Sequence, residues 1–198
     1  MMRKLLLVFI AIALSANFSI AQDVKKYVKT GEKRIYHDND QLWKIGQVEN
    51  YRKVGEWKTY HENGQLESIG RYENNEKTGV WKYYFNEGIY KSNIKKIGHL
   101  LRTGSYENGA TRGIWKYYHD NGQLESIGHY KTGERKGYFK NGQLRYIGRI
   151  EKYENTGEWK TYAENGQLIA QGKYLNGDKV GEWTYYYDDG EFMKTENY

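Results

Sequence analysis

Five histidines and many carboxylates are the residues of this chain whose types could bind a metal or support acid–base chemistry. Three of the histidines, His37, His61 and His119, directly follow a recurring tyrosine, which favours a structural role. Successive strand pairs of a sheet lie about 9–10 Å apart, too far for shared metal coordination at about 2 Å. No stretch combines a nucleophile, a base and an orienting group. We therefore expect no catalytic residue, no metal site and no cofactor.

A second recurring pattern, Lys-x-Tyr, could bind a ligand or partner. Alternate residues of a strand share one face, so the lysine and the tyrosine of each copy should lie side by side. Rings with hydroxyls next to cations could stack on sugars or hold acidic groups of glycans, lipids or a protein. The alternative is that the tyrosines form a second packed face and the lysine stems extend over them. The copies are Lys58/Tyr60, Lys82/Tyr84, Lys116/Tyr118 and Lys160/Tyr162.

Both patterns belong to a longer one, Gly-x-Trp followed by Tyr-x-x-Asn-Gly-Gln-Leu, whose clearest copy runs from Gly55 to Tyr72. The equivalent tyrosines are Tyr36, Tyr60, Tyr84, Tyr118, Tyr138, Tyr162 and Tyr186. They are separated by 24, 24, 34, 20, 24 and 24 residues. A period in the twenties is typical of repeat arrays, in which each unit buries its apolar face against its neighbours.

Asn-Gly between alternating residues is the strongest short-range hairpin signal, because a type I′ turn needs positive φ at both central positions. We place Asn63 and Gly64 in such a turn. The resulting pairs are Glu62/Gln65, His61/Leu66, Tyr60/Glu67, Thr59/Ser68, Trp57/Gly70 and Gly55/Tyr72. The stretch 72–79 is then the second turn, which leads into the next hairpin. Seven hairpins predict an all-β protein, an elongated antiparallel array of about fourteen strands and roughly 65–70 Å.

This register sets each indole opposite a glycine. The pairs are Trp57/Gly70, Trp115/Gly128 and Trp159/Gly172, and Trp81 and Trp183 occupy the same position in further copies. A ring laid over a strand glycine shields the bare backbone from water. We expect each indole to cover the glycine directly across its own hairpin, as the main structural contact of the repeat.

Two places break the period. About ten residues are added within 89–112, and the fifth repeat loses four residues and has Arg135 at the tryptophan position. For the insertion, variation in loop length and a protruding segment that contacts a partner both stay open. The terminal copies are atypical as well, with Lys33 at the tryptophan position of the first and Glu196 at the glycine position of the last. A charge at that position discourages edge-to-edge association.

The composition fits a thin sheet faced with rings better than a compact domain. The chain has 21 tyrosines and 6 tryptophans, and it has no proline, which a long antiparallel ladder tolerates almost nowhere. It also has no cysteine, so disulfides and thiolate chemistry are excluded.

Residues 1–21 have the features of a secretory signal peptide, and residues 22–198 form the repeat domain. A basic start precedes the apolar run 5–14, which is too short for a membrane span, and a small-x-small site precedes Gln22. We predict an exported protein that is periplasmic, associated with the outer envelope or secreted, and retention of the segment as an anchor is the alternative. Its removal lowers Lys+Arg from 31 to 29 against 25 acidic residues, a net charge of +4. The signs alternate, so we expect no nucleic-acid partner.

The pattern Gly-x-Trp-x-x-Tyr-x-x-Asn-Gly-x-Leu, with the connector 174–181, resembles the variant MORN repeats of bacterial proteins, including the YwqK-type antitoxins. The resemblance covers residues 31–198 and is closest in the copies that begin at Gly55, Gly157 and Gly181. It implies a row of β-hairpins that acts as a binding or assembly surface. Eukaryotic MORN arrays are associated with membrane lipids and protein scaffolding, and the YwqK-type group with neutralising a toxin. The signal peptide departs from that group and argues against a cytoplasmic immunity role.

We therefore predict a non-enzymatic exported repeat protein that provides a protein-binding or envelope-scaffold surface. A protein is the first candidate partner, and a cell-wall glycan or an anionic membrane surface are the others. One alternative is a carbohydrate-binding module, because the run 81–88 is similar to the aromatic hairpins of choline- and glucan-binding modules. The other is an antitoxin, which requires that residues 1–21 are retained.

Overall fold

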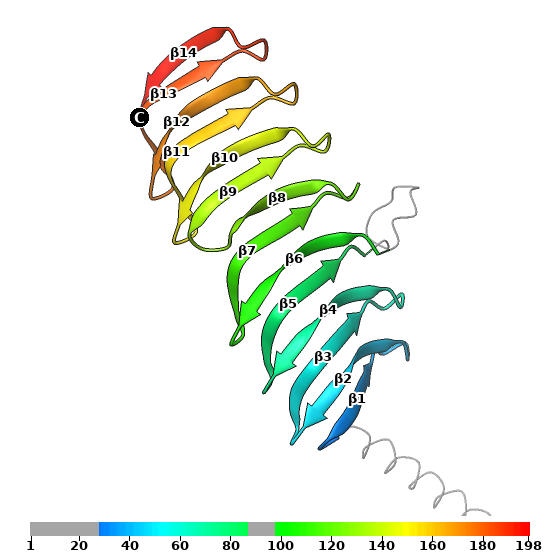
Figure 1. The fold of residues 1–198 in the computed structure, drawn as a ribbon. Helices are drawn as coiled ribbons and strands as arrows, with labels where there is room; N and C mark the ends of the chain where they lie inside the picture. Colours follow the sequence, from blue (N-terminus) through cyan, green and yellow to red (C-terminus); the bar gives the residue numbers. More distant parts are fainter. Residues whose placement is uncertain (1–27, 87–97) are drawn as a thin grey trace, which may run out of the picture.

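The computed structural model describes residues 28–86 and 98–198, which form one antiparallel sheet of fourteen strands (Figure 1). The strands are β1 (Gly31–Tyr36), β2 (Leu42–Glu49), β3 (Arg52–Tyr60), β4 (Leu66–Glu73), β5 (Glu76–Tyr84), β6 (Leu100–Glu107), β7 (Ala110–Tyr118), β8 (Leu124–His129), β9 (Gly133–Tyr138), β10 (Leu144–Glu151), β11 (Glu154–Tyr162), β12 (Leu168–Leu175), β13 (Asp178–Tyr186) and β14 (Phe192–Asn197). They lie in chain order across the sheet, and the odd-numbered strands end at the seven recurring tyrosines. The predicted all-β hairpin array is confirmed.

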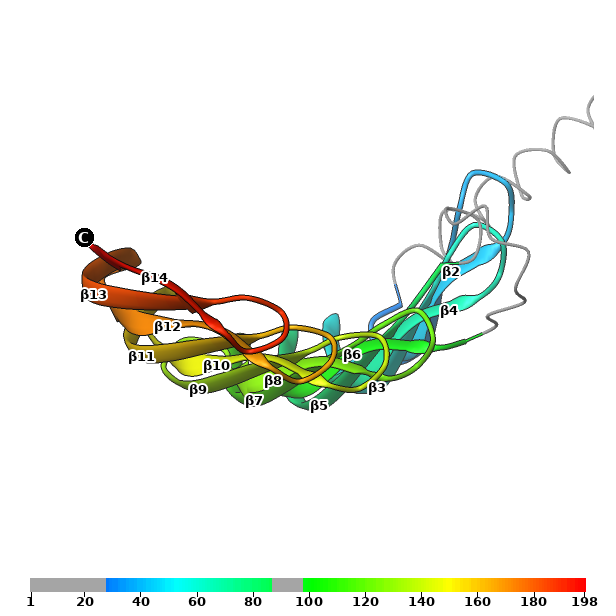
Figure 2. The same ribbon diagram turned by 90° about the horizontal axis from the view of Figure 1, so that it is seen from above.

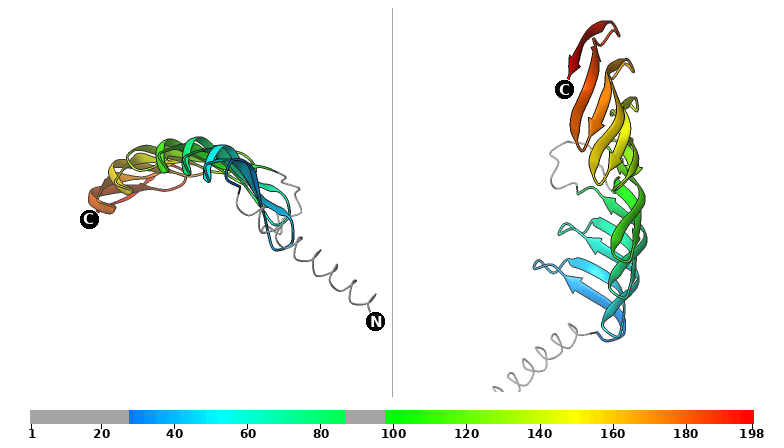
Figure 3. Two further views of the ribbon diagram at one scale, coloured as in Figure 1. Left: turned by 90° about the horizontal axis from the view of Figure 1, so that it is seen from below. Right: turned by 90° about the vertical axis from the view of Figure 1, so that its left-hand side faces the viewer.

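The sheet is long, twisted and arched, and β1 and β14 form its two ends (Figures 2 and 3). The predicted signal peptide and residues 89–97 of the predicted insertion lie outside the described residues. Residues 100–112 of that insertion belong to β6, to β7 and to the two-residue turn between them, and Trp81 pairs with Gly104 in the register of the other hairpins. Across residues 28–86 and 98–198, no helix is long and apolar enough to cross a membrane.

The hairpin β3–β4 has the predicted register at its base but not at its tip. The predicted pairs Gly55/Tyr72, Trp57/Gly70 and Thr59/Ser68 are present. At the tip, Tyr60 pairs with Leu66, and Glu67 is the extra residue of a β-bulge. The predicted pairs Tyr60/Glu67, His61/Leu66 and Glu62/Gln65 are therefore wrong.

The predicted type I′ turn at Asn63 and Gly64 is also wrong, because this loop has three residues. His61 N donates to Gln65 O at 2.8 Å and Gly64 N to His61 O at 2.9 Å. Gly64 has a left-handed φ of 79°, but Asn63 does not have a positive φ. This combination is typical of three-residue loops in which a type I turn is followed by a glycine bulge. The third loop residue and the bulge at Glu67 shift the register in opposite directions. Their effects cancel, and so the base of the hairpin is paired as predicted.

The asparagine of the loop is needed for its side chain. Asn63 Oδ1 accepts the N–H of Gln65 at 3.1 Å, and its Nδ2 donates to Asn86 Oδ1 of the following loop at 3.0 Å. In other loops the corresponding Nδ2 donates to a carbonyl of the next loop, as Asn141 does to Glu164 O at 3.2 Å. The Asn-Gly motif therefore joins consecutive hairpins along one edge of the sheet.

Two-residue turns with left-handed φ lie at the other edge. Asn74 and Asn75, with φ of 48° and 73°, connect β4 to β5, which fits a type I′ turn. Two of these turns place a tyrosine at the second position, Tyr51 with φ 65° and Tyr153 with φ 76°. A left-handed φ costs an ordinary residue roughly 1–2 kcal/mol.

We expect Tyr51→Gly to raise the free energy of unfolding by about 0.5–1 kcal/mol, because relief of the left-handed strain exceeds the added freedom of the unfolded chain. The Tyr51 side chain is 62% exposed, and its backbone N–H keeps its bond to Lys29 O at 2.8 Å. Urea unfolding measures the change. Gly109→Ala, at the same turn position with φ 76°, should change stability in the opposite direction. A destabilised Tyr51→Gly variant would contradict the account of the turn.

Each indole of the Gly-x-Trp motif lies over a glycine of the preceding hairpin. Trp57 pairs with Gly46 on one side and Gly70 on the other, but its ring occupies the place that a Cβ on Gly46 would take. The predicted cover of a glycine within the same hairpin is therefore wrong, although the predicted register at the base of the hairpin is right. The covered glycines and their rings are Gly46/Trp57, Gly70/Trp81, Gly104/Trp115, Gly148/Trp159 and Gly172/Trp183.

The glycine of Gly-x-Trp explains this direction. Gly55, with a left-handed φ of 65°, and Glu56 are extra residues of β3 relative to β2, so the ladder breaks after Gly46. The carbonyl of Gln47 lies at this break and accepts the indole N–H of Trp57 at 3.0 Å. Equivalent bonds join Trp81 to Arg71, Trp159 to Arg149 and Trp183 to Lys173 at 3.0–3.2 Å.

The five indoles are 2–8% exposed, and their row forms the core of the sheet. We call this side the tryptophan face and the other side the opposite face. Figure 1 shows why the core is a row: each hairpin meets only the hairpins before and after it.

Candidate functional site

Tyrosines fill the spaces between the indoles of the tryptophan face. Tyr72 contacts Trp57 and Trp81 edge-on, with ring centroids 6.0 and 5.2 Å apart. Tyr106 and Tyr174 make the same two contacts further along the row. Such pairs contribute about 0.5–1.5 kcal/mol each beyond their burial, and burial raises the pKa of Tyr72. Most of this row is packed protein interior.

A lysine four residues before an indole adds to this packing. Lys77 Nζ lies 4.2 Å from the ring centroid of Trp81 and donates to the Tyr83 hydroxyl at 2.8 Å. Burial lowers the pKa of Lys77. Lys179 makes the same two contacts with Trp183 and Tyr185, at 4.5 and 2.7 Å. This lysine was not among the predicted site residues, although the 24-residue spacing between Lys53 and Lys77 indicates that it recurs with the repeat.

Lysines gather around a hollow of about 200 Å³ on the tryptophan face of the first three hairpins. Lys44, Lys53 and Lys77 line it. The pKa of Lys53 is lowered by burial and, less strongly, by the charges of Lys44, Lys33 and Lys77. Glu67 lines the same hollow, and its carboxylate offsets part of this repulsion, so the lysines alone do not make the hollow an anion site.

The predicted Lys-x-Tyr residues all lie on the opposite face, spread along the sheet rather than gathered in one pocket. Tyr60, Tyr84, Tyr118 and Tyr162 are half-buried, Lys82, Lys116 and Lys160 are exposed, and Lys58 is intermediate. Lys58 forms an ion pair with Glu56 at 3.5 Å. Within the described part of the chain, Lys82, Lys116 and Lys160 form no ion pair. Lys160 and Tyr162 also line an open hollow of about 560 Å³.

A further pocket lies where the fifth repeat lacks its tryptophan. Arg135 of β9 pairs with Gly128 of β8 and Gly148 of β10, and so it occupies the tryptophan position as predicted. The main chain of Glu134 and Arg135, instead of a ring, approaches Gly128. The predicted contact of Trp115 with Gly128 is therefore limited to strand pairing. The pocket beside this junction has a volume of about 200 Å³.

Two of the three recurring histidines join hairpins to one another. His37 Nε2 lies 2.9 Å from Tyr60 O, and His119 Nε2 lies 2.9 Å from Tyr138 O, so each Nε2 carries the proton. His61 Nε2 is buried without a partner. The residues described here include no group of three or more side chains that could hold a metal.

Comparison with known proteins identifies the repeats. The family model "MORN repeat variant" matches residues 53–74, 112–132, 131–152 and 155–176, which lie on hairpins built around β3–β4 and from β7 to β12. None of the curated proteins compared with this chain matches its sequence. MORN repeats form a non-catalytic family whose members often mediate protein or membrane-lipid interactions. The matched stretches and the hairpin array together show that this chain is a MORN-repeat protein.

Proposed function

We propose that the chain is an exported, non-enzymatic repeat protein that binds another protein through the opposite face of its sheet. The supporting observation is the contrast between the two sets of lysines. On the tryptophan face, Lys77 and Lys179 are already engaged by rings and hydroxyls. On the opposite face, Lys82, Lys116 and Lys160 are exposed next to half-buried tyrosines and form no ion pair among the described residues.

The regular spacing of these lysines favours a partner with acidic side chains. Successive hairpins are about 10 Å apart, near one Debye length, so the lysines tolerate one another and can each meet a separate carboxylate. Indoles join the successive hairpins, except at the junction of the fourth and the fifth, and keep this spacing fixed. The partner would therefore meet a preorganised surface, which lowers the entropic cost of binding.

The test replaces Lys82, Lys116 and Lys160 together by Gln. We expect about tenfold weaker binding of the partner that is cross-linked to the wild-type protein in intact cells, because each exposed charge pair contributes about 0.5 kcal/mol. A control with Lys29, Lys140 and Lys152 replaced by Gln loses the same charge at the turns and should bind normally. Unchanged binding by the first variant would refute the proposed surface. Retention on purified peptidoglycan would support the carbohydrate-binding alternative instead.

Export is tested on the same protein. We expect N-terminal sequencing of the exported product to begin at Gln22, which would exclude the cytoplasmic antitoxin alternative. A product that starts at the initiator methionine and stays in the cytoplasm would contradict the proposal.

A further inference from the structure

The pocket at the fifth repeat arises because the row of rings is interrupted there. Edge-on and tilted contacts run from Trp115 to Tyr130 and from Tyr130 to Tyr153, with centroids 6.2 and 5.6 Å apart. The next indole is Trp159, whose contacts are with Tyr146 and Tyr174. No ring contact joins these two series within residues 28–86 and 98–198.

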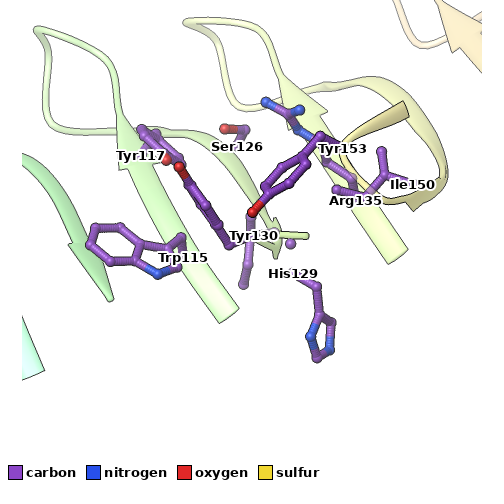
Figure 4. A pocket seen from close by; sticks show the side chains of 10 residues that line it. Trp115, Tyr117, Ser126, His129, Tyr130, Arg135, Ile150 and Tyr153 are labelled. Carbon is purple, nitrogen blue, oxygen red and sulfur yellow. The ribbon is translucent and has the colours of Figure 1, made fainter. Parts of the chain in front are cut away.

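The deletion in the fifth repeat accounts for the missing ring. β9 has six residues, against nine in β7 and β11, and it begins at Gly133, so its Gly133-Glu134 pair lies at the very start of the strand and not as extra residues inside a longer ladder. Arg135 is exposed and cannot fill the space as an indole would, while Ile150 is buried at the far side. Figure 4 shows Trp115 on one side of the pocket, Arg135 and Ile150 on the other, and Tyr130 and Tyr153 between them.

A second replacement leaves a hydroxyl without its usual partner. In the third and seventh hairpins, a lysine bonds the tyrosine two residues after the indole, as Lys77 does with Tyr83 at 2.8 Å. In the fourth hairpin the lysine position is Thr111, and the tyrosine is Tyr117, which lines the pocket. In the described chain, the Tyr117 hydroxyl forms no hydrogen bond.

The charge in the pocket is also uncompensated. Glu134, the acidic residue nearest in sequence to Arg135, forms its ion pair with Lys136 at 2.8 Å. The side chain of Arg135 forms neither an ion pair nor a hydrogen bond among the described residues. The pocket thus combines a free guanidinium and a free phenol hydroxyl with aromatic walls.

We propose that this pocket binds a carboxylate carried on a planar ring. A cavity of about 150 Å³ holds one benzene ring, so the pocket of about 200 Å³ has room for a ring and a short acidic side arm. The ring packs against the exposed sides of Trp115 and Tyr130 in the pocket beside this junction. The carboxylate accepts two parallel N–H bonds from Arg135, and the Tyr117 hydroxyl is a further donor.

Such a ligand has two sources, a free aromatic acid or the C-terminal aromatic residue of a polypeptide. Both present a ring next to a carboxylate. The inference does not depend on the proposed function, because this pocket is on the tryptophan face and the partner surface is on the opposite face.

The test measures binding to the full chain by calorimetry, with 3-phenylpropionate and a short peptide ending in phenylalanine as probes. We expect saturable binding of at least one probe. Its neutral counterpart, 3-phenylpropanol or the amidated peptide, should bind at least about tenfold more weakly, because a charge-assisted hydrogen bond is lost. The probe that binds more tightly identifies the source.

Variants assign the binding to this pocket. Arg135→Gln should weaken the probe at least about tenfold and Tyr117→Phe about threefold. Arg149→Gln, an exposed arginine on β10 that lines the opposite face, should leave the affinity unchanged. Circular dichroism confirms that each variant is folded, which we expect because Arg135 is exposed. Failure of both probes to bind, or unchanged affinity of a folded Arg135→Gln variant, would overturn the proposal.

Discussion

Gly70→Ala is expected to lower the free energy of unfolding by about 3–5 kcal/mol. A Cβ on Gly70 would overlap the indole of Trp81, so the methyl group and the ring cannot both keep their places. Trp81 is 2% exposed, and its displacement costs nearly as much as removing a buried tryptophan. Urea unfolding followed by circular dichroism measures the loss.

Gly79→Ala is the matched control, since a Cβ there has nothing within 4 Å and only the left-handed φ of 64° is strained. We expect it to cost about 1–2 kcal/mol. A double-mutant cycle adds a second check: Gly70→Ala should couple to Trp81→Leu in the next hairpin and not to Trp57→Leu in its own hairpin. Coupling to Trp57 would restore the prediction from sequence and refute the observed direction of the indole.

Trp81→Ala is expected to cost about 3–5 kcal/mol and to split the unfolding of the array. Trp81 connects β5 to the hairpin β3–β4 through the cover of Gly70 and the bond to Arg71 O at 3.2 Å. Because each hairpin contacts only its neighbours, weakening this junction should free β1 to β4 to open separately. Hydrogen exchange should show lower protection in these four strands than in the rest of the sheet.

Trp43→Ala provides the comparison, because Trp43 is 37% exposed and covers no glycine. Its loss should cost less than about 2 kcal/mol and leave one cooperative transition. If both variants showed the same loss and the same single transition, the indoles of the repeat would not be the contacts that join the hairpins.

The strand order and the register at the base of each hairpin could be predicted from the sequence because both follow from the repeat period. Alternation along a strand places Trp57 across from Gly70 for any hairpin centred on Asn63 and Gly64. The sequence does not distinguish a two-residue turn from a three-residue loop with a bulge, since the two give the same register below Thr59. The inferred turn was therefore wrong while the pairs below it were right.

The sequence could not predict which glycine an indole covers. Trp57 has a glycine on each side, and the choice depends on the extra residues Gly55 and Glu56, which break the ladder on the β2 side alone. The pocket at the fifth repeat left a visible signal, Arg135 and Thr111 at positions of tryptophan and lysine. The replacement leaves a pocket because of the path that the main chain of β9 takes next to Gly128. This path cannot be predicted from the sequence.

Because each repeat indole contacts the hairpin before it, the junctions between hairpins can form in order from the N-terminus. A hairpin that emerges later carries the ring, and the hairpin that emerged earlier already holds the bare glycine and the free carbonyl that receive it. Vectorial synthesis or secretion from the N-terminus can therefore complete one junction after another without waiting for the last residues. β14 differs from the other receiving strands, because Glu196 stands where they have the covered glycine, and so β14 has no glycine that a ring could cover.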